Sequence, residues 1–424
     1  MHFAQEHTSS YYAATVNDVT NYPRLRDEIS VDVCVIGGGF TGIATALTLA
    51  ERSYNVCVLE ANRIGWGASG RNGGQMIGGI SGESKLLKAH PDLADLVWDM
   101  RWRGHQIIRE RVQRYDIACD LKRGYLDVAI KPRHLRDLEE QEQWLARRAF
   151  PFEHRLLSRD ETRDAIGTDA YIGALQNMGN GHLHPLNLCI GEAKAAETLG
   201  VDIFEQTAAM GIEHGDRVRI LTAEGSVSAF FAVIAGNAYQ VLDRSLRSRL
   251  FPVRSYIIAT APLTDEQLDT INPHDLAVCD PNFMLEYFRL SADKRLLFGG
   301  RCNYFGEDPD VIAARLKPRM LKIYPQLKDI GIDYAWGGTI AVPVNRVPQL
   351  GRIAPNVFFS HAYSGHGVNV THLAGEVIAD AVGGTMERFD VFAGLRSSRI
   401  PGVTHFGNAM VSLGMIWYGM RDRL

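Results

Sequence analysis

The chain has 424 residues, of which 46% are hydrophobic and 22% are charged. This length suits two or three domain-sized units better than one, and the composition is typical of a globular protein with a sizeable core. There are 45 basic against 49 acidic residues, and the net charge of −4 indicates neither a nucleic-acid binder nor an acidic tail.

Membrane and export segments are not expected. No run of about 18 apolar residues predicts a transmembrane helix, and residues 1–12 lack the apolar core of a secretory signal. The cysteines at 34, 57, 119, 189, 279 and 302 form neither a C-x-x-C pair nor a metal-ligand spacing. We therefore expect a cytoplasmic protein with reduced thiols, without metal, membrane or nucleic-acid partners, and of undecided oligomeric state.

A strand–helix–strand unit is predicted near the N-terminus. Residues 31–36 are a β-branched run typical of a buried strand, and apolar residues over 43–50 recur at helical spacing. A second strand over 55–59 ends at Glu60. The turn at 37–42 reads G-G-G-F-T-G, which is the G-x-G-x-x-G pattern of a dinucleotide-binding unit.

Each part of this pattern has a physical purpose. Gly37 permits the tight turn, Gly39 lets the backbone approach a pyrophosphate, and Gly42 lets the helix pack on the strand. The helix N-terminus offers N–H groups and a positive dipole to phosphates. Glu60 follows Gly39 by 21 residues, so it can accept hydrogen bonds from both ribose hydroxyls and would repel a 2′-phosphate. The residues expected at the cofactor are Gly37, Gly39, Phe40, Thr41, Gly42, Glu60 and Ala61.

A second glycine-dense loop over residues 63–75 favours FAD over NAD. An NAD-binding domain usually continues into another helix here, whereas small residues let the backbone pass close to a flat ring and a long diphosphate. The alternative is a flexible linker, which its arginine and asparagine residues disfavour. The residues expected to contact FAD here are Arg63, Gly67, Ala68, Ser69, Asn72, Gly73, Gly74 and Gln75.

Later segments continue the same pattern. Strands are predicted over 200–205, 230–237 and 357–360. A turn over 363–367 and a helix that ends at 383–384 follow the last of them.

The chain resembles the D-amino-acid-oxidase/sarcosine-oxidase superfamily of flavoproteins, and within it most resembles the γ-glutamylputrescine oxidase branch. The matching pieces span nearly the whole chain. They are His7–Tyr12, the strand–helix–strand unit, Gly67–Gln75, Arg295–Gly300 and Ser364–Val368.

The resemblance and the element pattern together predict an α/β fold. A Rossmann-like FAD-binding domain would join a second α+β substrate domain built on an antiparallel sheet. We expect the discontinuous FAD-binding domain at 1–85, 155–240 and 335–385, the substrate domain at 86–154 and 241–334, and a C-terminal tail at 386–424 that packs on the body.

The resemblance also implies further contacts with the cofactor. The backbone near Ala209 would touch the adenine, and the end of the strand at Ala235, Gly236 and Asn237 would close over the dinucleotide, although a plain sheet strand is equally compatible. Gly338 is also expected at the cofactor. The helix after the 363–367 turn would direct its positive end at the flavin and stabilise the negative charge that develops on reduction. The residues there are Gly365, His366, Gly367 and Val368.

Candidate catalytic residues are Arg301, Tyr256 and His366. Arg301 could hold a substrate carboxylate by a two-point hydrogen bond, or be a surface residue at a strand end. Tyr256 and Tyr287 could form walls of the amine channel, or simply pack in the core. His366 could instead be a turn residue whose backbone matters more than its imidazole.

Two departures from the superfamily bear on the chemistry. Sarcosine-oxidase-like relatives carry a lysine that promotes reaction with oxygen, where this chain reads Leu296-Leu297-Phe298, so the electron acceptor stays open. Some relatives bind flavin through a cysteine, whereas the matching region here, Trp336–Thr339, has none. We therefore predict non-covalent FAD.

The leading hypothesis is FAD-dependent oxidation of a γ-glutamylated diamine by hydride transfer to flavin N5, giving aldehyde and ammonia, with hydrogen peroxide as a further product if oxygen is the electron acceptor. The alternatives are oxidation of an N-methyl or cyclic amino acid, a flavoprotein without amine turnover, and an NAD-linked dehydrogenase.

Overall fold

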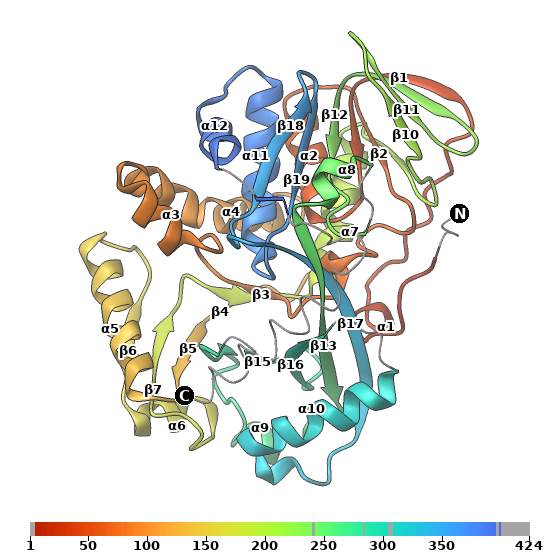
Figure 1. The fold of residues 1–424 in the computed structure, drawn as a ribbon. Coiled ribbons are helices and arrows are strands. Elements are labelled where there is room, and N and C mark those ends of the chain that lie inside the picture. Colours follow the sequence, from red (N-terminus) through yellow and green to blue (C-terminus); the bar gives the residue numbers. More distant parts are fainter. Residues whose placement is uncertain (1–4, 240–241, 283–284, 304–307, 396–397, 400–424) are drawn as a thin grey trace.

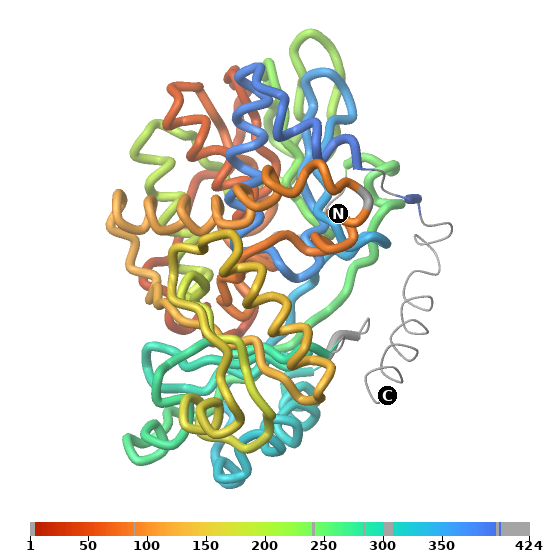
Figure 2. Tube along the Cα trace, turned by 90° about the vertical axis from the view of Figure 1, so that its left-hand side faces the viewer, coloured from red at the N-terminus to blue at the C-terminus, as the bar shows by residue number. Residues whose placement is uncertain are grey.

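The computed structural model describes residues 5–239, 242–282, 285–303, 308–395 and 398–399. Two eight-stranded sheets and one three-stranded sheet make up its framework. The first sheet and its helices lie at the top of Figure 1, and the second sheet lies below them with α10 (Pro309–Ile323) at the bottom. The side view in Figure 2 shows the same two levels.

The first sheet is built on five parallel strands in the order β9, β2, β1, β12 and β19. β18 pairs antiparallel with β19, while β10 and β11 form an antiparallel arm on β12. The strands are β1 (Glu28–Ile36), β2 (Val56–Leu59), β9 (Asp202–Phe204), β10 (Gly211–Glu213), β11 (Val218–Leu221), β12 (Ser226–Ile234), β18 (Gln349–Ala354) and β19 (Val357–His361).

Both faces of this sheet are buried, as expected for parallel strands. On β1, Val33 and Val35 pack into the core beneath the helices, whereas Cys34 and Ile36 pack into a separate core on the opposite face. This explains the unbroken apolar run in the sequence. The covering helices, which pack against one another, are α2 (Phe40–Glu51), α4 (Ala94–Arg114), α7 (Pro185–Thr198) and α11 (Gly367–Val382).

The second sheet has the order β17-β13-β16-β15-β14-β5-β7-β6 and is antiparallel except where β14 meets β5. α10 packs against β13, β16 and β17. The strands are β5 (Tyr125–Ala129), β6 (His154–Leu157), β7 (Gly173–Asn177), β13 (Leu250–Thr260), β14 (Ala277–Cys279), β15 (Glu286–Leu290), β16 (Leu296–Asn303) and β17 (Ile332–Pro343).

Alternation along these strands separates the two faces of the second sheet. On β13, Tyr256 and Ile258 lie in the core on the α10 side. Ser255 and Ile257 line a cavity on the other face, toward the first sheet. This division decides which side chains can reach a ligand.

The remaining elements are short or peripheral. The three-stranded sheet joins β3, β8 and β4. These elements are α1 (Tyr11–Ala14), β3 (Gln75–Met76), α3 (Glu83–Ala89), β4 (Lys122–Arg123), α5 (Pro132–Arg147), α6 (Arg159–Ile166), β8 (Gly181–His182), α8 (Arg244–Arg247), α9 (Asp265–Leu268) and α12 (Glu387–Gly394).

Sheet membership differs from the expected domain ranges in three places. Residues 154–177 contain β6 and β7 of the second sheet, and β17 extends that sheet to Pro343. α4, which was expected with the second sheet, packs on α11, and its Trp102 also lies in a core with Ala129 of β5 and Leu175 of β7. Each of these segments packs through its apolar face. The local apolar pattern does not indicate which of the two sheets that face will contact. Of the expected tail, residues 386–395 pack on the first core through α12, while 396–397 and 400–424 lie outside the described residues.

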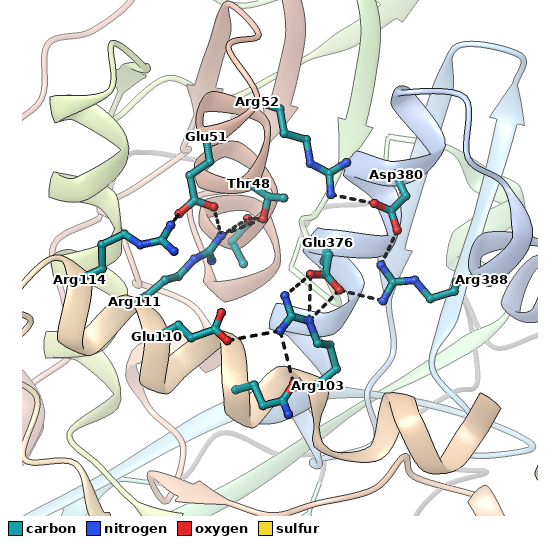
Figure 3. A network of polar contacts seen from close by, with 12 residues as sticks. Thr48, Glu51, Arg52, Arg103, Glu110, Arg111, Arg114, Glu376, Asp380 and Arg388 are labelled. Atoms are coloured by element: carbon teal, nitrogen blue, oxygen red, sulfur yellow. Dashed lines mark hydrogen bonds and ion pairs between the residues drawn. The ribbon is translucent and has the colours of Figure 1, made fainter. Parts of the chain in front are cut away.

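An ion-pair network joins α4 to α11 and α12 (Figure 3). The Glu376 carboxylate accepts hydrogen bonds from Arg103 at 2.6 and 3.0 Å and from Arg388 at 2.8 Å. Arg388 also binds Asp380, which pairs with Arg52 of the α2 C-terminus at 2.7 Å. The network therefore fixes α4 and α12 to the helices that cover the first sheet.

Replacing Glu376 tests the contribution of this network to stability. Its two arginine partners outweigh the opposing effect of burial and lower the pKa of the Glu376 carboxyl. Because the folded-state pKa is lowered, the stabilisation is present above the unfolded pKa of about 4.3 and is lost as pH falls through the folded value. Glu376→Gln should therefore lower the free energy of unfolding at pH 7 by about 1–3 kcal/mol, with a smaller effect at acid pH.

The control is Glu110→Gln, which removes the other acidic partner of Arg103. That pair spans 3.6 Å and Glu110 is 54% exposed, so the expected loss is under about 1 kcal/mol. Urea denaturation of both variants at pH 7 and near pH 4 measures the difference. Equal losses for the two variants at pH 7 would contradict this description of the network.

Candidate active site

A cavity of about 810 Å³ lies between the first and second sheets. One wall comes from the 37–41 turn, the 60–75 loop, the residues after β12 and the N-terminus of α11. The opposite wall comes from β5, β13, β14, β15 and β17. A volume in this range, with mostly apolar walls and a few polar groups, is characteristic of small-molecule and cofactor sites.

The turn after β1 forms a tight cradle at one end of the cavity. Gly37 has a φ of +116°, and a Cβ there would lie 2.8 Å from the carbonyl oxygen of Ala235. A Cβ on Gly39 would lie 2.8 Å from Ser69 Oγ. The N–H of Phe40 donates to that same hydroxyl at 2.9 Å, which leaves the other N–H groups of the first α2 turn for a diphosphate.

Glu60 occupies the position expected for a ribose-binding acid. Its carboxylate accepts hydrogen bonds from the backbone N–H of Gly38 at 2.7 Å and of Asn62 at 2.8 Å. A carboxylate can accept about four hydrogen bonds, so capacity remains for two hydroxyls. Burial raises the pKa of Glu60 to about 7, since it outweighs these two donors.

The beginning of the glycine-dense loop is held by a buried carboxylate that local sequence patterns do not reveal. Glu205 is fully buried and accepts the N–H of Ile64 at 2.7 Å and a hydrogen bond from Thr20. Arg63 donates to Glu205 at 2.9 Å and to Glu6 at 2.8 Å, so its guanidinium is already paired within the protein. Arg63 does not line the cavity, and its paired guanidinium supports the loop, so its expected contact with the cofactor stays a prediction.

The end of this loop rests on the second sheet. Gln75 donates from its amide to the carbonyl of Val278 on β14 at 3.0 Å, and Arg289 of β15 donates to the Gly73 carbonyl at 2.8 Å. A Cβ on Gly73 would lie 2.5 Å from the ring of Tyr287. The backbone therefore passes directly over an aromatic side chain of the substrate-side sheet.

The turn before α11 is strained in a way that brings the helix N-terminus to the cavity. Ala362, Ser364 and Gly365 have φ values of +66°, +56° and +85°. Tyr363 secures the turn, because its hydroxyl bonds Thr41 Oγ1 of α2 at 2.8 Å and Ser360 Oγ of β19 at 2.6 Å. The N-termini of α2 and α11 thus face the same cavity, and both contribute positive dipole ends.

His366 is the residue immediately before α11, and it lines the cavity. Its Nε2 lies 3.2 Å from the carbonyl oxygen of Ile77. Burial lowers the pKa of His366 to about 4, so the imidazole is neutral at pH 7. A neutral ring contributes a dipole and shape rather than a charge.

Most residues expected at the cofactor line this cavity, although their contacts with it stay a prediction. They are Gly37, Gly39, Phe40, Thr41, Glu60, Ala61, Gly67, Ala68, Ser69, Asn72, Gly73, Gln75, Ala235, Gly236, Asn237, Gly338, Gly365, His366, Gly367 and Val368.

Three other expected cofactor residues lie behind the wall. A Cβ on Gly42 would lie 1.8 Å from the Gly37 carbonyl oxygen, and one on Gly74 would lie 2.2 Å from that of Leu183, so both glycines permit close packing. Ala209 is buried in the core of the first sheet.

Of the candidate catalytic residues, Tyr256 does not face the cavity, so its expected role there is wrong. Tyr256 lies in the core on the α10 side, on the face opposite the cavity, because of strand alternation. Ser255 and Ile257 take the cavity-facing positions. The backbone of Arg301 belongs to β16, whereas its side chain lies outside the described residues.

Sequence reasoning missed three charged residues of the cavity wall: Arg71 of the glycine-dense loop, Asp127 of β5 and Arg346 after β17. A signal existed for Asp127, which is the one charged residue of the otherwise apolar or aromatic strand Tyr125–Ala129. Arg346 follows a turn and carries no such pattern. Tyr287, considered as a channel wall, does line the cavity.

In the described part of the chain, the His, Cys, Asp and Glu residues form no group of three or more that could hold a metal ion. Among the helices described, none has both the length and the apolar surface that a membrane span requires. Cys279 lines the cavity as a free thiol, and burial raises its pKa, which keeps the thiol protonated.

Comparisons with known proteins match this architecture. The family model described as FAD dependent oxidoreductase matches residues 32–381. The chain is 42% identical over 424 residues to γ-glutamylputrescine oxidoreductase of Escherichia coli, covering 99% of both chains. It is 40% identical to the probable oxidoreductase OrdL of Haemophilus influenzae, covering 99% of this chain and 98% of that one. Glycine oxidase from Bacillus cereus shares the fold, with a TM-score of 0.71, 20% identity, and coverage of 87% of this chain and 100% of that one.

The raised pKa of Glu60 predicts pH-dependent binding of FAD. Below pH 7 the carboxyl of the cofactor-free protein is protonated, whereas ribose hydroxyls donate best to the ionised form. The Kd for FAD should therefore fall as pH rises from 6 to 8, by up to about tenfold per unit on the acid side of the pKa. Glu60→Gln should flatten this dependence.

Titration of the cofactor-free protein with FAD, followed by flavin fluorescence at pH 6, 7 and 8, measures the effect. Glu28→Gln serves as the control, because Glu28 is 64% exposed and lies at the far end of β1. An unchanged pH profile in Glu60→Gln would show that another group controls the binding.

Proposed function

Because the chain belongs to the family of FAD-dependent oxidoreductases, we propose that it oxidises the primary amine of γ-glutamylputrescine or of a related γ-glutamyl polyamine. Support comes from the 42% identity, over 99% of both chains, to the E. coli enzyme named for this substrate. This similarity favours a γ-glutamylated amine over an N-methyl or cyclic amino acid.

The structural observation that supports the proposal is the cavity that lies between the two sheets. Its first-sheet wall is a backbone cradle with two helix N-termini, and its second-sheet wall is apolar strands with few polar side chains. The cradle suits a dinucleotide, because its glycines let the protein backbone approach the diphosphate closely. The strand wall suits an elongated, partly aliphatic molecule.

When bound, FAD supplies a ring that accepts a hydride from the carbon next to the amine nitrogen. The α11 N-terminus stabilises negative charge on the side of the cavity that it faces. Tyr287 and Ile257 form an apolar floor that excludes water and aligns the aliphatic part of the substrate. His366, neutral at pH 7, completes the wall without adding a charge that would repel a substrate cation.

The substrate's carboxylate requires a cationic partner. We expect Arg346, which lines the cavity, or Arg301, whose backbone lies in β16, to bind it through a two-point hydrogen bond. The cytoplasmic location and the use of oxygen as electron acceptor are part of the same proposal.

Anaerobic mixing with substrate tests this function. γ-Glutamylputrescine should bleach the flavin band near ~450 nm, because hydride transfer reduces the ring. Free putrescine and sarcosine are the comparison compounds and should bleach it far more slowly. Recovery of colour with peroxide on aeration would identify oxygen as acceptor. A yellow protein that sarcosine reduces and γ-glutamylputrescine does not would refute the proposed substrate.

Acid precipitation tests the mode of flavin attachment. Cys279 is the free cysteine of the described cavity wall, and burial keeps its thiol protonated and poorly nucleophilic. All yellow colour should therefore appear in the supernatant. A yellow pellet that persists in the wild type and disappears in Cys279→Ser would instead identify a covalent link at that residue.

A further inference from the structure

Three cavity-lining residues form one row across the second sheet. Tyr287 of β15 pairs with Cys279 of β14, and Cys279 pairs with Asp127 of β5. Paired residues point to the same face, so all three side chains lie on the side of the cavity. Two strand spacings separate Tyr287 from Asp127, which corresponds to about 10 Å.

The carboxyl of Asp127 lacks a full ionic partner. The Gln141 side chain donates to it, and the charge of Arg101 also favours its ionised form, yet burial dominates and raises its pKa to about 6. Arg101 forms its ion pair with Glu83 at 2.7 Å, and its guanidinium lies 4.8 Å from the centre of the Trp144 ring. Within the described ranges, no ion pair joins Asp127 to a cation. An added cation would therefore stabilise this carboxylate.

The position of Asp127 relative to the cofactor loop suggests which cation it receives. Gly73 of that loop lies over the ring of Tyr287, at one end of the row. Asp127 lies at the other end, two strands away from Tyr287 and one strand beyond the β14 carbonyl that Gln75 of the same loop binds. In extended γ-glutamylputrescine, nine bonds separate the oxidised carbon from the α-amino nitrogen, a span of about 11 Å at the bond lengths of such chains.

We propose that Asp127 binds the α-ammonium group of the glutamyl end and selects amines that carry a second cation at this distance. This inference rests on the proposed function and names the group through which that site recognises its substrate. Asp127 is thus a specificity residue, remote from the carbon that is oxidised. It would reject aliphatic monoamines, because they would leave the desolvated carboxylate without a partner.

Two substrates separate this role from any effect on the chemistry. Glutarylputrescine has the same chain and carboxylate as γ-glutamylputrescine but lacks the α-amino group. Asp127→Asn should reduce kcat/KM for γ-glutamylputrescine by about 10- to 100-fold, as expected for loss of a charge-assisted hydrogen bond. The same variant should process glutarylputrescine as well as the wild type does, or better. Asp127→Glu should recover part of the lost preference.

The control variant is Asp137→Asn, which removes an exposed carboxylate from α5, the helix that carries Gln141. It should leave both rates unchanged. Flavin content and circular dichroism of each variant establish that it folds and binds FAD.

The outcomes distinguish this proposal from the proposed function. If γ-glutamylputrescine does not reduce the wild-type flavin, the proposed function fails before Asp127 is tested. If the wild type oxidises both substrates equally well, or if Asp127→Asn lowers both rates by the same factor, the α-ammonium assignment is wrong while the amine oxidase function stands.

Discussion

The close approach of helix α2 to the end of strand β1 is the constraint on which the site depends. A side chain at Gly42 would place its Cβ 1.8 Å from the Gly37 carbonyl oxygen, so only glycine lets the helix begin so near the strand. A second contact of this kind brings α11 onto α2, where a Cβ at Gly375 would lie 2.8 Å from the Ala44 backbone. Together they direct two helix N-termini at one cavity. The positive ends of both helices then act on the same ligand.

The rest of the molecule holds the polar groups of that cavity in place. Glu205 holds the start of the loop after Glu60 by accepting the N–H of Ile64, while Gln75 and Arg289 attach the other end of the loop to the second sheet. Glu205 also pairs with the Arg63 side chain, and all three groups bind backbone atoms of the loop or of the sheet, which fixes the path of the loop. On β5 and β13 of the second sheet, alternate residues face the cavity and the residues between them pack in the core on the α10 side. On these two strands the residues that can meet a ligand are therefore every second one.

The parts that could be predicted from the sequence are those that depend on a few consecutive residues. The 37–42 turn, Glu60 and the 365–368 turn each combine glycine and polar residues in a pattern with a local physical cause, and all reach the cavity. Tyr256 could not be placed, because its strand is apolar on both faces and only the position of α10 decides which face is core. The residues that surround Arg63 and Asp127 could not be predicted either, because they are distant in the sequence. Glu205 lies 142 residues beyond Arg63, and the row of Asp127 is completed by strands more than 140 residues away.

A crystal structure of the FAD-bound enzyme would show directly where the cofactor lies between the two sheets. We expect the diphosphate at the first turn of α2, the ribose at Glu60, and the flavin ring between the α11 N-terminus and the Tyr287 face of the second sheet. A ring that lies outside this cavity, or one that meets the α10 face of the sheet, would show that the cavity between the sheets is not the flavin site.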